Sequence, residues 1–274
     1  MASSPTLTLN NGVQIPQLGI GVYLVTGADV QPTVRTALEV GYRHIDTAAA
    51  YGNEDGVGKA IAESGIPRDE LYVTTKLPND DHGHADATKA FEQSLERLGL
   101  DYVDLYLIHW PCPAKDRYVE TWQALEKLHA DGRARCIGVS NFLPDHLRRL
   151  EAECTVVPAV NQVELHPTFA QSSLAQVHRE LGIATESWSP LGVGADLDTP
   201  TVTEIATRLG RTPAQVVIRW HLQLGYVVIP KSATPERIAA NFDVFDFELD
   251  DADMSAISAL DADNRIGGHP DEVE

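Results

Sequence analysis

The chain of 274 residues is 43% hydrophobic, which is enough for a sizeable buried core, and it has no run of about eighteen apolar residues that would span a membrane. Its 21 basic and 40 acidic residues give a formal charge of -19, which repels nucleic-acid phosphates and anionic lipid surfaces. The amino terminus lacks a signal-peptide pattern, and the three cysteines are too scattered for a disulfide framework. We therefore expect a cytoplasmic monomer that binds a small molecule and neither nucleic acid nor a membrane.

The first expected element is a β-hairpin over residues 6–16. Asn11 and Gly12 lie between two short alternating runs, which is the signal of a tight turn with both central residues at positive φ. We interpret this hairpin as a small lid on a larger fold.

After the hairpin, short apolar runs alternate with amphipathic stretches. Eight runs are strand candidates, the number that closes a parallel barrel, and they are apolar nearly throughout, as expected for strands covered on both faces. The candidate strands are residues 17–22, 42–47, 71–77, 103–110, 134–140, 159–165, 183–191 and 226–232.

The segments between these runs have a helical period and glycine stop signals. Three of them, residues 29–41, 91–99 and 201–210, end on a glycine. Residues 213–225 and 250–260 are expected as two additional helices, before and after the last strand. The sequence thus predicts a (β/α)8 TIM barrel with an N-terminal β-hairpin lid and two extra helices, as one domain over residues 1–274.

Alternative motifs fit the chain poorly. An open dinucleotide-binding sheet needs Gly-x-Gly-x-x-Gly after its first strand, but Leu24 stands where the third glycine belongs. Residues 53–60 lack the first glycine and the final Ser or Thr of a phosphate loop, and Ser140 is outside an esterase motif. We interpret His82 and His84 as part of a solvated loop, and expect no metal site.

Titratable residues follow three early strands, at the end of the barrel where such enzymes keep their chemistry. Asp46, Lys76 and His109 each close an apolar run. One such residue alone is more often a paired surface charge or part of the core, but three at equivalent positions indicate a site. A buried lysine needs a counter-charge, which Asp46 can provide, and its ammonium lowers the pKa of a nearby phenol. Tyr51 is then expected to be a proton donor near neutral pH.

Several ordered motifs resemble one known family. They are GYRHIDTAAAYGNEDGVG, TTKL, VDLYLIHWP, GVSNF, NQVELHP and IPKS, which together resemble the aldo-keto reductase superfamily from the hairpin to the tail. The segments ESWSPLG, NFDVFDFEL and HPDEVE look most like the prokaryotic branch that contains 2,5-diketo-D-gluconate reductase.

The resemblance implies an enzyme and assigns its catalytic residues. It implies NADPH-dependent reduction of aldehydes, α-dicarbonyls or keto-sugar acids such as 2,5-diketo-D-gluconate, with a hydride arriving from the nicotinamide. Asp46, Tyr51, Lys76 and His109 match the family's catalytic set. Tyr51 would protonate the carbonyl oxygen, Lys76 and Asp46 would tune the phenol, and His109 would orient the carbonyl.

The resemblance also assigns residues around the nicotinamide. Polar side chains at strand ends would hold the carboxamide, and an aromatic ring would stack on the nicotinamide. Without the family, Trp188 would be read as core and Asn141 as a helix cap. The residues concerned are Ser140, Asn141, Gln162, Trp188, Ser189 and Leu191.

The segment after the last strand offers an anion site in an otherwise acidic chain. Lys231, Ser232 and Arg237 provide two cations and a hydroxyl beside a helix start, although a solvated loop is the alternative. The resemblance implies that they hold the 2′-phosphate of NADPH, with Asn241 near the adenine. Because Thr234 stands where relatives often have another cation, weaker use of NADH remains open.

The substrate pocket is where the chain departs from the family. Pro78 replaces an aromatic residue after TTKL, which leaves Tyr23, Trp110 and His109 as expected substrate contacts, with the tail near His269. Two other functions remain to be weighed: a redox-sensing regulatory module without turnover, and metal-assisted hydrolysis. The hydrolase is disfavoured because no three ligands have suitable spacing.

Overall fold

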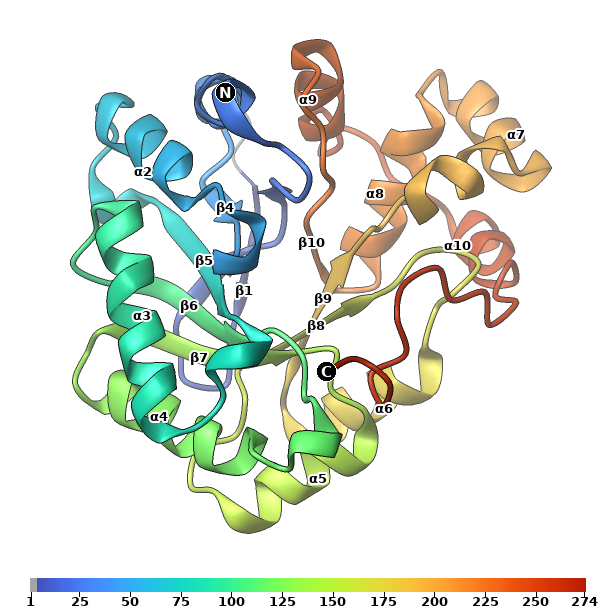
Figure 1. The fold of residues 1–274 in the computed structure, drawn as a ribbon. Coiled ribbons are helices and arrows are strands. Elements are labelled where there is room, and N and C mark those ends of the chain that lie inside the picture. Colours follow the sequence, from blue (N-terminus) through green and yellow to red (C-terminus); the bar gives the residue numbers. More distant parts are fainter. Residues whose placement is uncertain (1–3) are drawn as a thin grey trace.

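The computed structural model describes residues 4–274 and shows a parallel β-barrel surrounded by helices (Figure 1). Eight strands pair in chain order, and every pair is parallel. Backbone bridges from Leu18 to Val228 and from Gly21 to Lys231 join the first and last strands, so that the sheet closes. The strands are β3 (Gly19–Gly21), β4 (His44–Asp46), β5 (Tyr72–Leu77), β6 (Val103–Ile108), β7 (Ala134–Ser140), β8 (Val160–Glu164), β9 (Ala184–Trp188) and β10 (Val227–Val228).

The expected (β/α)8 barrel is therefore confirmed, and helices cover the outside of its strands. Their buried faces carry the apolar residues that the helical period predicted. The helices are α1 (Val30–Val40), α2 (Glu54–Glu63), α3 (His84–Leu98), α4 (Tyr118–Ala130), α5 (Pro144–Glu153), α6 (Ser172–Leu181), α7 (Pro200–Leu209), α8 (Pro213–Gln223), α9 (Pro235–Phe242) and α10 (Asp251–Ser258). Among residues 4–274, no helix combines the length and apolarity needed to cross a membrane.

Two of these helices are additions to the barrel, as expected, but one differs from the sequence-based assignment. The segment 213–225 was expected to be the extra helix before the last strand. In the structure α8 packs against β10 and α9, as a barrel helix does, whereas α7 packs against α8 and α10. The extra helices are therefore α7 and α10, and they lie side by side outside the barrel (Figure 1).

The N-terminal hairpin pairs β1 (Thr6–Thr8) with β2 (Gln14–Pro16), and it lies behind the barrel strands in Figure 1. Leu9 and Ile15 are buried against the inward side chains of β5 to β8. Asn10 Nδ2 also donates to the backbone oxygen of Pro158, 3.0 Å away and just before β8. The hairpin thus closes the amino end of the barrel, opposite the end where the candidate catalytic residues lie.

The turn of the hairpin differs from the prediction. Only Gly12 has a positive φ, at 85°, and Asn11 does not. Gly12 N donates to Leu9 O and Leu9 N donates to Val13 O, each over 2.9 Å. This is the longer loop in which a turn is followed by one left-handed glycine, rather than a two-residue turn with both residues left-handed.

Short 3-10 turns connect several strands to the helices that follow them. The turn η2 (Ala49–Tyr51) carries Tyr51, and η6 (Gly192–Asp198) follows β9. The others are η1 (Gly27–Asp29), η3 (Arg68–Glu70), η4 (Asn79–Asp81) and η5 (Pro113–Lys115).

Candidate active site

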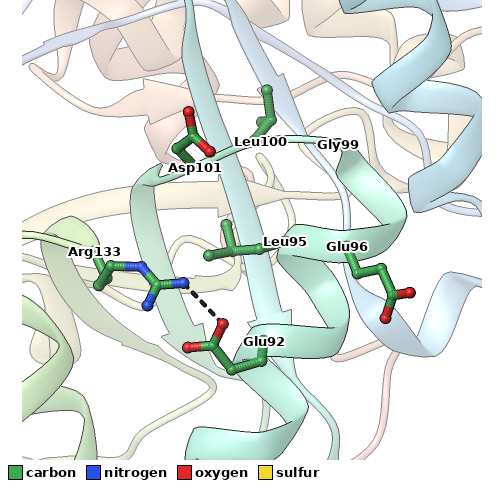
Figure 2. A pocket seen from close by; sticks show the side chains of 7 residues that line it. All are labelled: Glu92, Leu95, Glu96, Gly99, Leu100, Asp101 and Arg133. Carbon is green, nitrogen blue, oxygen red and sulfur yellow. Dashed lines mark hydrogen bonds and ion pairs between the residues drawn. The ribbon is translucent and has the colours of Figure 1, made fainter.

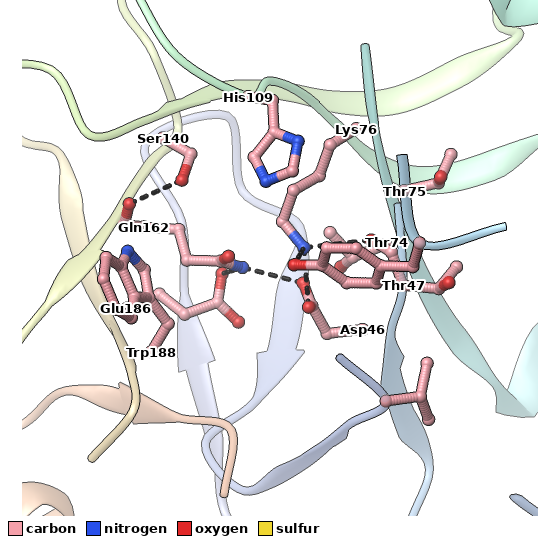
Figure 3. Close-up of polar contacts among 12 residues, drawn as sticks. Asp46, Thr47, Thr74, Thr75, Lys76, His109, Ser140, Gln162, Glu186 and Trp188 are labelled. Atoms are coloured by element: carbon pink, nitrogen blue, oxygen red, sulfur yellow. Dashed lines mark hydrogen bonds and ion pairs between the residues drawn. The ribbon is translucent and has the colours of Figure 1, made fainter. Parts of the chain in front are cut away.

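Three residues from successive strand ends and one from the turn after β4 meet at the carboxyl end of the barrel. Asp46 is the last residue of β4, Lys76 lies near the end of β5, and His109 directly follows β6. Tyr51 reaches the same place from η2, and its ring centroid lies 5.7 Å from that of His109. Parallel pairing places β4, β5 and β6 side by side, so the barrel brings together residues far apart in the sequence (Figure 3).

Lys76 is the centre of this group, and its ammonium is completely buried. Nζ donates to Asp46 Oδ1 over 2.6 Å, to Thr47 O over 2.9 Å and to the Tyr51 hydroxyl over 3.3 Å. These three contacts use the three hydrogens of the ammonium. The lysine therefore has a fixed position, and its charge lies directly beside the phenol oxygen.

The electrostatics keep Lys76 charged and the His109 ring neutral. Burial alone lowers the pKa of Lys76, but the charge of Asp46 and the contacts with Asp46 and Tyr51 outweigh burial and raise that pKa above its usual range. Burial, and to a smaller extent Lys76, lowers the pKa of His109 to about 3, so its ring is neutral at pH 7.

Tyr51 departs from the expectation in one respect. Its pKa is raised above the usual value because burial outweighs the opposing charge of Lys76. The expected lowering of the phenol pKa is therefore wrong for the ligand-free protein, although Lys76 acts in the expected direction. Tyr51 is protonated throughout the neutral range and can act as a hydrogen-bond donor.

A second layer of polar residues lies behind the lysine. Gln162 of β8 donates through Nε2 to Asp46 Oδ2 over 2.7 Å and to Glu186 Oε2 over 3.1 Å. With both amide hydrogens used, only Oε1 of Gln162 remains to accept a hydrogen bond from a ligand. The amide is thus oriented by two carboxyl groups (Figure 3).

The end of β7 supplies a rigid polar corner. Asn141 has a left-handed φ of 65°, and its Nδ2 donates to His109 O and to Ser140 Oγ. Its Oδ1 accepts from Trp188 Nε1 over 2.9 Å, which fixes the indole at the end of β9. Ser140, Asn141, Gln162 and Trp188 therefore lie together, beside the catalytic group. A strained backbone that the surroundings hold in place is common at ligand sites.

The chain after β9 continues past this corner. Ser189 has a left-handed φ of 46°, and its carbonyl accepts from Gly192 N over 2.9 Å. Leu191 packs partly buried against the hydrophobic core and leads into η6. Both residues thus lie next to Trp188 along one connected loop.

The predicted anion-binding residues cluster after β10, at the start of α9. Ser232 and Asn241 are buried, and Lys231 and Arg237 are exposed. Across residues 4–274, neither Lys231 nor Arg237 has an ion-pair partner, although acidic residues are nearly twice as numerous as basic ones. Two unpaired cations beside a helix start are suited to a phosphate group.

Aromatic residues lie beside the candidate catalytic group. The Tyr23 ring is 55% exposed and its centroid lies 5.1 Å from that of Tyr51. Trp110 is half-buried, and a side-chain carbon on Gly268 of the tail would lie 3.9 Å from its ring. The C-terminal tail thus reaches the substrate side, and Pro78 follows β5 on the same side.

Comparison with known proteins identifies the family. A family model described as the Aldo/keto reductase family matches residues 17–262. The chain belongs to the aldo/keto reductase family. An aldo-keto reductase of Mycolicibacterium smegmatis is 55% identical over 267 residues, covering 97% of each chain. Glyoxal reductase of Bacillus subtilis is 51% identical over 269 residues, covering 98% of this chain and 97% of the relative. The crystal structure of a variant of Gox0644 in complex with NADPH is 46% identical, covers 100% of both chains and has a TM-score of 0.96.

A separate surface hollow of this aldo/keto reductase lies near the starts of β6 and β7, at the amino end of the barrel. Figure 2 shows the side chains that line it. It is beside the loop between α3 and β6, and Arg133 in it already pairs with Glu92 over 2.8 Å. The remaining charges in the hollow are acidic, so it has no free group for an anion. It is lined by Glu92, Leu95, Glu96, Gly99, Leu100, Asp101 and Arg133.

The expectation that both His82 and His84 lie in a solvated loop is wrong for His82. His84 is exposed, as expected for a solvated loop, but His82 is only 1% exposed. Burial, more than nearby cations, lowers the pKa of His82 to about 4. Within residues 4–274, no group of three His, Cys, Asp or Glu residues is arranged to hold a metal ion.

Sequence analysis missed Glu186, the second carboxyl group bound to Gln162. It is completely buried inside the barrel, where its Oε1 lies 3.6 Å from His44 Nε2 and accepts no hydrogen bond. Burial, with a smaller effect of the Asp46 charge, raises the pKa of Glu186 to about 8. Glu186 stands in the middle of an apolar run, with no local pattern to reveal that it faces the barrel interior.

We expect Glu186→Gln to stabilise the enzyme more at high pH than at low pH. The folded chain holds a proton on Glu186 between the ordinary carboxyl pKa of 4.5 and about 8, so wild-type stability falls as pH rises through this window. The neutral amide removes this loss. Melting temperatures measured at pH 5, 7 and 8.5 should show a gain for the variant that grows with pH.

Glu39→Gln on the surface of α1 is the matched control, because its side chain is 69% exposed. Its effect on the melting temperature should not follow this pH window. A gain for Glu186→Gln that is the same at all three pH values would contradict the interpretation.

Proposed function

We propose that this chain is an NADPH-dependent carbonyl reductase in which Tyr51 donates the proton to the substrate oxygen. The observation that supports this most directly is the buried Lys76 ammonium, which contacts both Asp46 and the Tyr51 hydroxyl. We also propose that the whole chain forms one catalytic barrel domain. The monomeric state and the cytoplasmic location expected from the sequence remain predictions.

The reduction needs a hydride at the carbonyl carbon and a proton at the carbonyl oxygen. Bound NADPH would supply the hydride. Tyr51 gives its proton to the oxygen, and the Lys76 ammonium, 3.3 Å from the phenol oxygen, stabilises the negative charge left on that oxygen. Neutral His109 offers an N–H that orients the carbonyl. Asp46 keeps the ammonium in place and balances its charge.

The residues near Trp188 fit a nicotinamide carboxamide. Both amide hydrogens of Gln162 are used, so its Oε1 is the atom left to accept a hydrogen bond. The N–H₂ group of a carboxamide needs such an oxygen as its partner. The indole of Trp188, fixed by Asn141, offers a flat surface for ring stacking. Ser140, Ser189 and Leu191 complete this side of the proposed cofactor site.

The unpaired cations Lys231 and Arg237 support NADPH over NADH, because only NADPH carries a 2′-phosphate. Ser232 adds a hydroxyl, and buried Asn241 is placed in α9 next to them for the adenine. Thr234, the N-cap of α9, adds no charge at this position. We therefore propose a clear but moderate preference for NADPH, with weaker use of NADH.

Arg237→Ala should weaken NADPH binding by about 1.5–3 kcal/mol and leave NADH binding nearly unchanged. This is the range for a charge-assisted hydrogen bond, and the bond exists only with the 2′-phosphate. The preference should shrink as salt rises, because exposed charge pairs are screened. Fluorescence titration of both cofactors at low and high salt measures these effects.

Arg35→Ala is a matched control for total charge, since Arg35 is an exposed arginine on α1. Its loss should affect the two cofactors equally and slightly. Equal, large losses for NADPH and NADH in Arg237→Ala would mean that Arg237 supports the fold or the shared pyrophosphate, and the 2′-phosphate site would have to be abandoned.

We propose small aldehydes and α-dicarbonyls as the first substrates to test, because the relative from Bacillus subtilis is named for glyoxal. Keto-sugar acids such as 2,5-diketo-D-gluconate follow from the branch resemblance. A panel of these compounds, assayed with NADPH and with NADH, tests the activity directly. The absence of turnover with every compound would favour the regulatory alternative, which no observation on the structure supports.

A further inference from the structure

A second buried charged group lies outside the catalytic set, beside Trp188. His166 is completely buried, and both of its ring nitrogens face carboxylates. Nδ1 lies 2.8 Å from Asp196 Oδ2, and Nε2 lies 3.2 Å from Glu164 Oε1. A neutral imidazole has a single N–H, so contacts with two carboxylates require the protonated, positively charged ring.

The three residues belong to segments that surround the proposed cofactor site. Glu164 ends β8, and Asp196 lies in η6. We call Glu164, His166 and Asp196 the His166 clamp. Burial lowers the pKa of His166, but its two carboxylate partners outweigh burial and raise that pKa to about 9.

Glu164 ties the clamp to the C-terminal tail. Its Oε1 accepts from Ile266 N over 2.6 Å, and its Oε2 accepts from Gly267 N over 2.8 Å. A side-chain carbon on Gly267 would lie 2.5 Å from the Trp188 ring, so the tail packs tightly against the indole at this point. In Figure 1 the tail runs from α10 back toward the barrel strands.

Asp196 ties the clamp to η6. Its carboxylate accepts from Thr168 Oγ1 over 2.8 Å and from Thr168 N over 3.3 Å. Thr168 O in turn accepts from two tail amides, Ala262 N over 3.0 Å and Asn264 N over 3.1 Å. The tail and η6 are therefore connected by two routes, through the buried ring between Glu164 and Asp196 and through Thr168.

We propose that His166 is a positioning residue whose imidazolium holds η6 and the C-terminal tail against the cofactor side of the barrel, and so slows the release of NADPH. This rests on the proposed function, because η6 continues directly from Ser189 and Leu191. His166 does not contact the catalytic group and takes no part in proton transfer.

Other titratable groups lie around the His166 clamp and have partners of their own. From α8, His221 Nε2 donates to Pro190 O over 3.0 Å, and burial lowers the pKa of His221 to about 3, so its ring is neutral. From the tail, Arg265 lies over the ring of Phe169, and Asp261 accepts from Ala170 N. The only carboxylates that contact the His166 ring within residues 4–274 are therefore Glu164 and Asp196.

The test compares His166→Gln with His178→Gln. His178 is also completely buried, but it bonds to Asn161 and Thr185, and burial lowers its pKa to about 4. At pH 7, His166→Gln should release NADPH at least about fivefold faster in stopped-flow fluorescence, since charge-assisted hydrogen bonds are lost. In the ligand-free protein, the amides of Ile266 and Gly267 should lose about tenfold of their hydrogen-exchange protection. His178→Gln should show neither change.

The pH dependence separates the clamp from a purely structural role. A histidine with a raised folded-state pKa stabilises the fold at low pH, and this effect is lost as pH rises through about 9. Wild-type release of NADPH should therefore accelerate between pH 8 and 10 toward the rate of His166→Gln, which should not change in this window. Asp196→Asn, a milder change, should move the acceleration to lower pH and serves if His166→Gln does not fold.

Failure of the His166 clamp and failure of the proposed function give different results. Unchanged exchange protection and unchanged release in a folded His166→Gln or Asp196→Asn variant would overturn the clamp. If the wild-type enzyme does not bind NADPH, the proposed function fails, and the hydrogen exchange of Ile266 and Gly267 alone decides whether His166 holds the tail.

Discussion

Replacing Tyr51 with phenylalanine is expected to lower kcat at least about a hundredfold and to leave NADPH affinity nearly unchanged. The change removes only the hydroxyl that accepts from Lys76 Nζ and faces the substrate side. His109 cannot take over as the acid, because its ring is neutral at pH 7. Steady-state kinetics on the best substrate, together with cofactor titration, measure both effects.

Tyr23→Phe is the matched control, because it removes a phenol hydroxyl from the neighbouring ring, 5.1 Å away between centroids. This variant should keep most of its kcat, with any change confined to KM. If Tyr51→Phe retained most of its turnover, the phenol would have no part in the mechanism.

Replacing Lys76 with methionine should reduce kcat at least as much and should also destabilise the fold. Methionine fills similar space but leaves Asp46 as a buried carboxylate without its cation, which costs about 3–5 kcal/mol. The phenol also loses the charge that stabilises its anion. Urea unfolding and kcat, measured on the same preparation, give the two quantities.

The double variant Lys76→Met, Asp46→Asn separates the two effects. It removes the unpaired charge and should recover most of the lost stability, while turnover stays low. A Lys76→Met variant that is less stable but fully active would show that Lys76 has only a structural role.

Three of the four candidate catalytic residues could be anticipated because each of them ends an apolar run. Asp46, Lys76 and His109 stand at equivalent positions of neighbouring strands, and parallel pairing then places them together whatever the loops do. The pairing of Lys76 with Asp46 follows from the cost of burying a lone ammonium. The net pKa of Tyr51 could not be anticipated, because it depends on how completely the ring is buried.

The residues that sequence analysis missed lack a local signal. Glu186 lies within a strand, where alternation does not reveal which face is buried in a barrel covered on both sides. His166 acquires its role only through Asp196, thirty residues later, and through tail amides about a hundred residues later. Such contacts depend on how loops of different length fold over one end of the barrel.

The two incorrect predictions about the fold, the type of hairpin turn and the identity of one extra helix, have similar causes. Asn-Gly is compatible with more than one kind of hairpin loop. Here the hydrogen bond from Asn10 to Pro158 O, just before β8, accompanies the longer loop. The helices α7 and α8 both begin with a Thr-Pro pair and have amphipathic faces, so their sequence does not show which one packs on β10.

The position of the N-terminal hairpin has a consequence for the order of folding during synthesis. The hairpin leaves the ribosome before the barrel strands, but Asn10 bonds to the chain 148 residues later, at Pro158. At about 5–20 residues per second, the apolar side chains of Leu9 and Ile15 wait roughly 7–30 s for β8, one of the strands that cover them. Through that interval the nascent chain exposes apolar surface at the amino end of the unfinished barrel, which favours aggregation.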